Sequence, residues 1–359
     1  MLHFILIFHS LFHFGLILQP INGEKLDELF EDLHARKQFN GNVIVARAGE
    51  VVYQASFGYA DSAQTIPLND SSVFELASVS KQFTATGIML LEADGLLDYD
   101  DLASEYIPDF PYPEITVRHL LQQRSGLVDY LSFGERWDPT VIGTNEDVLN
   151  IYRREQPSLT FPAGAKFAYA NINYVLLAEI IKNVSGQSYA DFLRDRIFLP
   201  LEMKHTRSYS TRWSEGEQIA NYATPLAYDP SAQGYYEAWG TEDYPLVAAA
   251  SGIEGDRSII STCPDLVRWE AAIRSNQLLT AEQWAVAYTA PTLADGSKSD
   301  YGFGIYLNPK RKKAWHWGSW AGVQTSFVRY LDSETVVVYL KNVESNDWSW
   351  LKRLEKLTR

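Results

Sequence analysis

The chain has 359 residues, of which 46% are hydrophobic and 13% aromatic, enough for a large core spread over about two structural lobes. This composition excludes an intrinsically disordered chain. The formal net charge is −14 with no block of like charges, which argues against nucleic acid because phosphates would require a basic face. Cys263 is the only cysteine, so no internal disulfide can form and a buried structural thiol is expected.

The first predicted element is an apolar stretch over residues 1–23, which contains no Lys or Arg. It predicts a secretory signal peptide cleaved after Gly23, and therefore a periplasmic or secreted protein. An uncleaved N-terminal membrane anchor is the alternative interpretation. No later segment of the sequence is long and apolar enough to cross a membrane.

The mature chain begins with an amphipathic helix over 25–36, where Leu26, Leu29, Phe30 and Leu33 recur at helical spacing. Two β-rich runs, 42–47 and 51–57, then predict a hairpin. The middle of the chain is mostly helical, and a long irregular segment over 222–244 is either a lid or a self-packed surface loop. Helices are expected at 82–92, 116–122, 147–154, 172–183, 189–198, 264–275, 281–287 and from 348, and later strands at 302–307, 314–317, 325–330 and 335–341.

Strands at both ends and helices between them predict an α+β fold. We expect one antiparallel sheet built from N- and C-terminal strands, with flanking helices and an inserted, mostly helical lobe. The sheet lobe would comprise about 24–77 and 290–359, and the helical lobe about 78–289, within one domain over 24–359.

The run 77–83 places Ser78 three residues before Lys81, where an extended stretch becomes an apolar helix. Positions three apart on a helix share one face, so the amine can take the hydroxyl proton that a serine nucleophile must lose. The start of a helix also offers free backbone N–H groups to an oxyanion. The alternative is an ordinary helix start with Ser78 or Ser80 as its cap.

Two further motifs follow in order: Tyr-x-Asn at 169–171 and His-x-Gly at 316–318. Together with Ser-x-x-Lys they resemble the serine β-lactamase and penicillin-binding protein superfamily. A tyrosine in the middle motif resembles the pattern of the class C branch of this superfamily, which includes D,D-peptidase and esterase relatives. The resemblance covers most of the chain and implies an active site between an antiparallel sheet and a helical lobe. Further stretches similar to family landmarks are 41–46, 119–121, 125–127, 162–164 and 174–177.

The resemblance implies that Ser78 is the nucleophile of an acyl-enzyme. Lys81 would act as base or hold the proton of the network, provided that burial and neighbouring charge lower its pKa. Tyr169 would relay a proton to the leaving group or, as a phenolate, serve as the base itself. Which of the two accepts the first proton stays open, because these groups titrate as a coupled set.

The remaining site residues are expected around this core. Asn171 would hydrogen-bond Lys81 or the acyl side chain, or cap the following helix. His316 would polarise Tyr169 or hold a substrate carboxylate. The turn after 125–127 would bring residues 129 and 130 near the cleft without an assigned role.

Two backbone features complete the expected site. Gly318 would let the strand approach the substrate closely. The N–H groups of Ser78 and Ser319 would form the oxyanion hole, in which losing one donor costs on the order of a hundredfold in rate.

The sequence departs from a class C β-lactamase at two positions: Ala170 replaces the usual Ser, and the third motif is His-Trp-Gly rather than Lys-Thr-Gly. Trp317 removes a hydroxyl that could bind a β-lactam carboxylate, and the His-x-Gly form resembles D,D-peptidases, D-aminopeptidases and esterases. We therefore expect a serine hydrolase of small-molecule esters or peptide-like amides.

The expected enzyme uses no cofactor and no metal, and the sequence implies no protein partner. The alternatives are a D,D-peptidase or D-aminopeptidase, a weak class C-type β-lactamase, and a catalytically silent binding protein on the same fold. A hydrolase with a Gly-x-Ser-x-Gly elbow is excluded because no such pentapeptide occurs.

Overall fold

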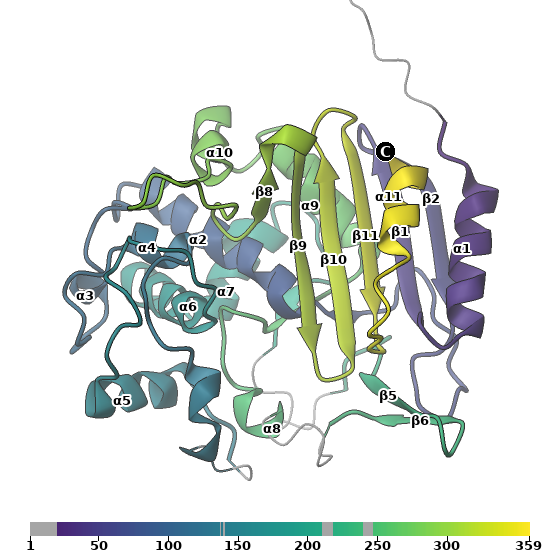
Figure 1. Cartoon of the computed structure of the whole chain (residues 1–359), viewed down its shortest axis with the longest axis horizontal. Helices are drawn as coiled ribbons and strands as arrows, with labels where there is room; N and C mark the ends of the chain where they lie inside the picture. The colour runs from purple at the N-terminus through teal and green to yellow at the C-terminus, as the bar shows by residue number, and fades with distance from the viewer. Residues whose placement is uncertain (1–19, 137, 139–140, 210–217, 240–246) are drawn as a thin grey trace, which may run out of the picture.

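The computed structural model describes residues 20–136, 138, 141–209, 218–239 and 247–359 (Figure 1). Most of the expected signal peptide therefore lies outside the described residues. Within them, no helix combines the length and apolar character that a membrane crossing requires.

A six-stranded sheet forms the centre of one lobe, in the order β2-β1-β11-β10-β9-β8. Every neighbouring pair is antiparallel, and β1 pairs along its whole length with β11, from Gly41 opposite Lys341 to Arg47 opposite Thr335. N- and C-terminal strands thus share one sheet, and the predicted α+β fold is confirmed. The strands are β1 (Gly41–Arg47), β2 (Glu50–Phe57), β8 (Tyr306–Asn308), β9 (Lys313–Trp320), β10 (Val323–Tyr330) and β11 (Thr335–Lys341).

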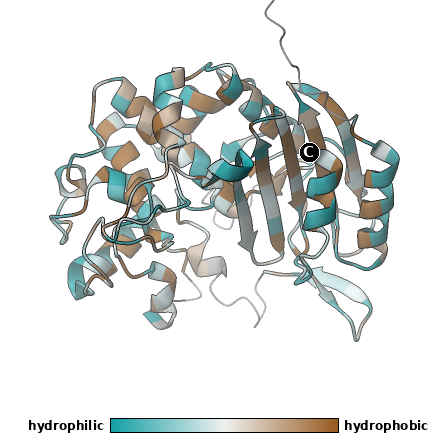
Figure 2. Cartoon of the chain, turned by 45° about the horizontal axis from the view of Figure 1, so that its top comes forward, coloured by the Kyte–Doolittle hydropathy of each residue, from teal (hydrophilic) through white to brown (hydrophobic). Residues whose placement is uncertain are grey.

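The two faces of the sheet carry different cores because successive side chains along a strand alternate in direction. On one face, Val337 and Tyr339 pack with Phe30 of α1 (Gly23–Ala35) and with Leu354 of α11 (Leu351–Thr358). On the other face, Val338 joins the larger core shared with the helical lobe. Figure 2 shows brown and teal residues mixed along the strands and the helices, with brown strongest in the middle of the sheet.

The helical lobe packs around α2 and α6, which lie against each other and are buried along most of their length. Gly87 permits this approach, since a Cβ there would lie 2.7 Å from Cδ1 of Ile181. Gly186 ends α6 with a left-handed φ of 70°, a conformation that glycine adopts without strain. The helices are α2 (Lys81–Ala93), α3 (Ala103–Tyr106), α4 (Val117–Leu121), α5 (Asn145–Glu155), α6 (Ile172–Ser185), α7 (Tyr189–Leu193), α8 (Val247–Ala250), α9 (Cys263–Arg274) and α10 (Ala281–Ala287), with short helical turns η1 (Ala77–Ser80), η2 (Tyr130–Arg136), η3 (Arg194–Phe198) and η4 (Pro309–Arg311).

Two expected segments differ in detail. The predicted strand over 302–307 begins only at Tyr306, because the Gly302 N–H donates to the Ile305 oxygen and Gly304 adopts a φ of 70°. The segment expected to be irregular over 222–244 contains a hairpin of β5 (Leu226–Asp229) and β6 (Gly234–Glu237), and residues 240–246 lie outside the described residues.

A small three-stranded sheet, which was not predicted from the sequence, lies where the two lobes meet. Its strands β3 (Phe74–Glu75), β7 (Ile259–Ser261) and β4 (Arg207–Ser208) are too short to give a periodic pattern. The strand β3 runs directly into η1, and β7 follows residues 256 and 257. The sheet therefore brings two segments that are far apart in sequence to one place.

Candidate active site

The turn η1 presents one partly exposed side chain, Ser78, among buried neighbours. Ala77, just before it, has a left-handed φ of 46°, a strained conformation for a residue with a Cβ. The sheet holds this turn: Oγ1 of Thr325 donates to the Leu76 oxygen at 2.7 Å. A Cβ on Gly318 would lie 2.4 Å from that same oxygen, so a glycine is required where β9 meets η1.

Ser80 has a different position from Ser78. It is fully buried, its Oγ donates to the Arg257 oxygen at 2.9 Å, and the same Oγ accepts from the Ile259 N–H at 3.2 Å. Both contacts tie η1 to the segment before β7. Of the two serines that the sequence offered, Ser78 is the one that faces the cleft.

Lys81 is fully buried at the start of α2 and donates to three oxygens. Its Nζ lies 3.1 Å from Oγ of Ser78, 2.9 Å from Oδ1 of Asn171 and 2.9 Å from the backbone oxygen of Asp256. Burial lowers the pKa of Lys81 to about 8, although the charges of Asp256 and Asp129 act to raise it. A substantial neutral fraction, able to accept a proton, is therefore present just above neutral pH.

Tyr169 lies beside this pair, with its ring centroid 5.0 Å from Nζ of Lys81. Burial raises the pKa of Tyr169 well above its ordinary value, and a hydrogen bond with Ser78 only partly offsets this. The phenol therefore carries its proton at neutral pH. A protonated phenol and an amine of lowered pKa therefore lie side by side next to Ser78.

Asn171 precedes α6 but makes no side-chain capping bond to that helix. Its Oδ1 accepts from Lys81, and its backbone N–H donates to the Asp129 carboxylate. Of the roles considered from sequence, the contact with the lysine is the one that the structure contains.

His316 is 1% exposed and lies beneath the cleft rather than on its surface. Its Nδ1 donates to the Trp317 backbone oxygen at 2.7 Å, and its Nε2 accepts from the Tyr301 hydroxyl at 3.0 Å. Burial lowers the pKa of His316 to about 3, so the ring is neutral. With both nitrogens engaged, the imidazole packs 6.1 Å from the Tyr169 ring and is not placed to contact a substrate carboxylate.

A cavity of about 420 Å³ opens above Ser78. Its walls are strongly aromatic, and Trp317 is 53% exposed there, an unusual position for an indole. Ser319 also lines the cavity, next to Trp320. The lining residues are Ala77, Ser78, Leu131, Tyr169, Asn171, Asp256, Arg257, Tyr306, Trp317, Ser319 and Trp320.

Of the buried polar cluster behind the lysine, the sequence placed only residue 130 near the cleft, without a role. The Tyr130 hydroxyl donates to Oδ2 of Asp256 at 3.0 Å, and Arg257 donates to the Tyr130 oxygen at 2.8 Å. The Arg257 guanidinium also stacks 4.1 Å from the Trp320 ring centroid. The acidic-basic pair at 256–257 matches no motif; only its position just before β7 brings it to the site.

A partly exposed serine bonded to a buried lysine, between an antiparallel sheet and a helical lobe, defines a serine hydrolase of the β-lactamase and transpeptidase fold. Comparison with known proteins makes the assignment specific. The chain belongs to the beta-lactamase family, whose model matches residues 26–356.

Among curated relatives, penicillin-binding protein 4* of Bacillus subtilis (strain 168) is 40% identical over 325 residues, covering 89% of this chain and 72% of the relative. A D-aminopeptidase of Cereibacter sphaeroides (strain ATCC 17029 / ATH 2.4.9) is 26% identical and is matched over 84% of this chain and 56% of its own length.

Solved structures agree on the fold. A penicillin-binding protein from Bacillus halodurans superposes with a TM-score of 0.79 at 23% identity, covering 92% of this chain and 98% of the other. A D-amino acid amidase from Ochrobactrum anthropi SV3, complexed with D-phenylalanine, gives a TM-score of 0.74 at 24% identity, with coverages of 93% and 97%.

Proposed function

We propose that this serine hydrolase cleaves peptide-like amides, and esters of similar shape, through a covalent acyl-enzyme on Ser78. The observation that carries the proposal is the 3.1 Å contact between Nζ of the buried Lys81 and Oγ of Ser78 at the base of an open cavity. A nucleophile within hydrogen-bond reach of a base whose pKa is lowered is the arrangement that acyl transfer requires.

The proposed reaction begins when neutral Lys81 takes the Ser78 proton as Oγ attacks the substrate carbonyl carbon. The N–H groups of Ser78 and Ser319 would hold the resulting oxyanion, since both residues line the cavity. Tyr169 then donates its proton to the departing nitrogen or oxygen, and the Lys81 proton replaces it. A water molecule attacks the acyl-enzyme along the same path and releases the acid.

The substrate class follows from the cavity walls. Trp317 and Tyr306 provide flat apolar surfaces, and neutral His316 supplies no charge to an anion. The Arg257 guanidinium on the cavity wall is already engaged by the Tyr130 hydroxyl and by Asp256 at 3.6 Å. An apolar or aromatic acyl group fits this surface better than the carboxylate of a β-lactam. The names of two relatives, a D-aminopeptidase and a D-amino acid amidase, support amides as the scissile group.

Side-by-side kcat/KM values for a D-Ala-D-Ala peptide with an amidated C-terminus, p-nitrophenyl butyrate and a chromogenic cephalosporin test this proposal. We expect the peptide and the ester to be turned over and the cephalosporin to react far more slowly. A cephalosporin that is the best substrate would contradict the interpretation of Trp317. A peptide far better than the ester would make the enzyme a peptidase whose ester activity is incidental.

We also propose that the chain works outside the cytoplasm, on the basis of the apolar stretch over residues 1–23. Mass spectrometry of the protein recovered from an expressing cell would show a mature N-terminus at Glu24. A fraction that retains Met1 and sediments with membranes would instead support the anchor.

A further inference from the structure

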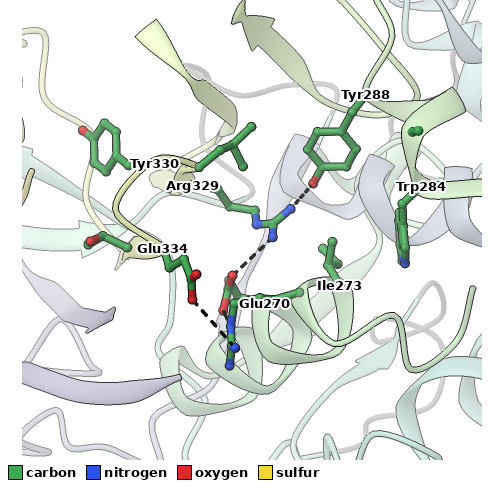
Figure 3. A pocket seen from close by; sticks show the side chains of 11 residues that line it. Glu270, Ile273, Trp284, Tyr288, Arg329, Tyr330 and Glu334 are labelled. Carbon is green, nitrogen blue, oxygen red and sulfur yellow. Dashed lines mark hydrogen bonds and ion pairs between the residues drawn. The ribbon is translucent and has the colours of Figure 1, made fainter. Parts of the chain in front are cut away.

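A second cavity, of about 400 Å³, lies at the other end of the sheet lobe (Figure 3). Its walls come from α9, α10, the end of β10 and the start of β11. Along β10, Gln324 pairs with Ser319 at the catalytic cleft, whereas Arg329 in the second cavity lies five residues further on. An antiparallel strand rises about 3.4 Å per residue, so five residues separate the two sites by about 17 Å. The second cavity is therefore not an extension of the cleft.

The floor of this cavity is a buried charged cluster. Arg329 is 8% exposed, and its guanidinium donates to the Tyr288 hydroxyl at 2.6 Å and to Oε1 of Glu270 at 3.3 Å. Figure 3 shows the Arg329 guanidinium between these two partners. Burying a charge in this way is costly unless its hydrogen-bonding groups are satisfied.

Three polar atoms around the cavity are not satisfied. Nε of Arg329, Oε2 of Glu270 and Nε1 of Trp284 are buried and have no hydrogen-bond partner among the described residues. All three side chains are more than nine-tenths buried. Oε2 of Glu270 lies 3.7 Å from Nε of Arg274, which leaves two donors, Nε of Arg329 and Nε1 of Trp284, without a protein partner beside the cavity. Because buried polar groups in proteins nearly always find a partner, a water molecule or a polar ligand would satisfy these donors.

The charges around the cavity specify the chemistry of that ligand. Two cations, Arg329 and Arg274, face two anions, Glu270 and Glu334, so the set is neutral overall. The ion pairs of Arg274 are loose, with its Nε 3.7 Å from Oε2 of Glu270 and its Nη1 4.0 Å from Oε2 of Glu334. A ligand that carries one charge of each sign can insert there without leaving a net charge buried.

The remaining wall is apolar. Ile273 and Leu331 line the cavity, and the Trp284 ring stands beside Ile273 on the side away from Glu334 (Figure 3). An apolar side chain of moderate size would be removed from water there. The cavity volume is in the range of small-molecule sites.

We propose that this cavity binds a free amino acid with an apolar side chain. Its carboxylate accepts hydrogen bonds from Arg329 and Arg274, and its ammonium donates to Glu270 and Glu334. The side chain rests against Ile273 and the Trp284 ring. The site uses no residue of the catalytic cleft, so it does not depend on the proposed function.

Isothermal titration calorimetry with L- and D-phenylalanine tests the site. We expect saturable binding to the unmodified protein of at least one of the two enantiomers. Two analogues with a single charge, 3-phenylpropionate and 2-phenylethylamine, should bind about tenfold more weakly or worse, because each can pair with only the arginines or only the glutamates of the cavity.

A matched pair of variants separates this cavity from the cleft. Ala285 is exposed at the cavity wall, so Ala285→Trp should fill the cavity without disturbing the core, whereas Val286→Trp on the same helix lies outside it. Ala285→Trp should lose phenylalanine binding and keep hydrolase activity, and Val286→Trp should retain both. Unchanged binding in Ala285→Trp, no binding at millimolar phenylalanine, or equal binding of the singly charged analogues would each overturn the proposal.

Discussion

The Nζ atom of Lys81 lies 2.9 Å from the backbone oxygen of Asp256, which is placed there by the small sheet at the junction of the lobes. The same residue contributes a buried carboxylate, whose Oδ1 has no hydrogen-bond partner among the described residues. Burial lowers the pKa of Lys81 to about 8, and the Asp256 charge is the largest effect that opposes it. Asp256 is therefore a positioning residue that holds the amine and partly offsets the effect of burial on its pKa.

This relationship predicts how activity depends on pH. The base form of Lys81 is neutral, so kcat/KM should rise as the pH increases through about 8, where the amine loses its proton. Asp256→Asn removes a charge that stabilises the ammonium. The rising limb of the pH profile of kcat/KM should therefore move to lower pH by about one unit. The measurement is the pH profile of kcat/KM for p-nitrophenyl butyrate.

Asp295→Asn, an exposed position outside the cavity, is the control and should leave the profile unchanged. A limb that stays in place in Asp256→Asn, with only the rate lowered, would show that Asp256 acts through packing alone. A shift to higher pH would mean that a group other than Lys81 controls the limb.

The second prediction concerns Lys81 and Tyr169 as one unit. Lys81→Ala and Tyr169→Phe should each lower kcat by several orders of magnitude, because both share the Ser78 proton. The double variant should be little slower than either single one, since residues that act together are strongly non-additive. Losses that multiply fully in the double variant would rule out a shared proton network.

Much of this site could be predicted because its chemistry sits in short motifs. Ser78 and Lys81 are one helical turn apart, so local spacing alone brings them together. Strands at both ends of the chain, with helices between them, predicted the antiparallel sheet, because most of these elements are long enough to show a periodic pattern.

The buried polar cluster behind Lys81 could not be predicted, because its residues belong to no short motif. Asp256 and Arg257 reach Lys81 only through β3 and β7, strands of two and three residues with no readable periodicity. The neutral state of His316 depends on its burial and on the charge of Lys81, which comes from a segment far away in the sequence. Tertiary placement, rather than residue type, decides the role of each.

The third prediction concerns the aromatic wall. Trp317→Thr restores a hydroxyl beside the oxyanion position and removes the indole from the cavity. It should lower kcat/KM for p-nitrophenyl butyrate about tenfold, through loss of apolar contact, and raise that for a cephalosporin. Trp348→Thr, at an indole that is 44% exposed outside the cavity, is the matched control and should change neither value. If Trp317→Thr lowered kcat/KM equally for both substrates, the indole would have only a structural role.

The fourth prediction concerns the contact between β9 and η1. In Gly318→Ala the new Cβ would lie 2.4 Å from the Leu76 oxygen and 2.5 Å from Oγ1 of Thr325, so the strand must move. Overpacking of this kind costs about 1–3 kcal/mol and should displace the oxyanion donors, lowering kcat more than KM rises. Chemical denaturation and steady-state kinetics measure the two effects. Gly234→Ala, where the Cβ has room, should change neither, and full activity in Gly318→Ala would disprove the close approach.

The acyl-enzyme itself is tested by labelling with a fluorophosphonate, followed by peptide mass spectrometry. We expect one adduct, on Ser78, and none in Ser78→Ala, which should fold normally because the hydroxyl is partly exposed. Ser80→Ala loses two buried hydrogen bonds, with Arg257 and Ile259, that lie away from the cleft, and it should still be labelled on Ser78. An adduct on Ser80, or hydrolysis at the unmodified rate by Ser78→Ala, would contradict the proposed mechanism.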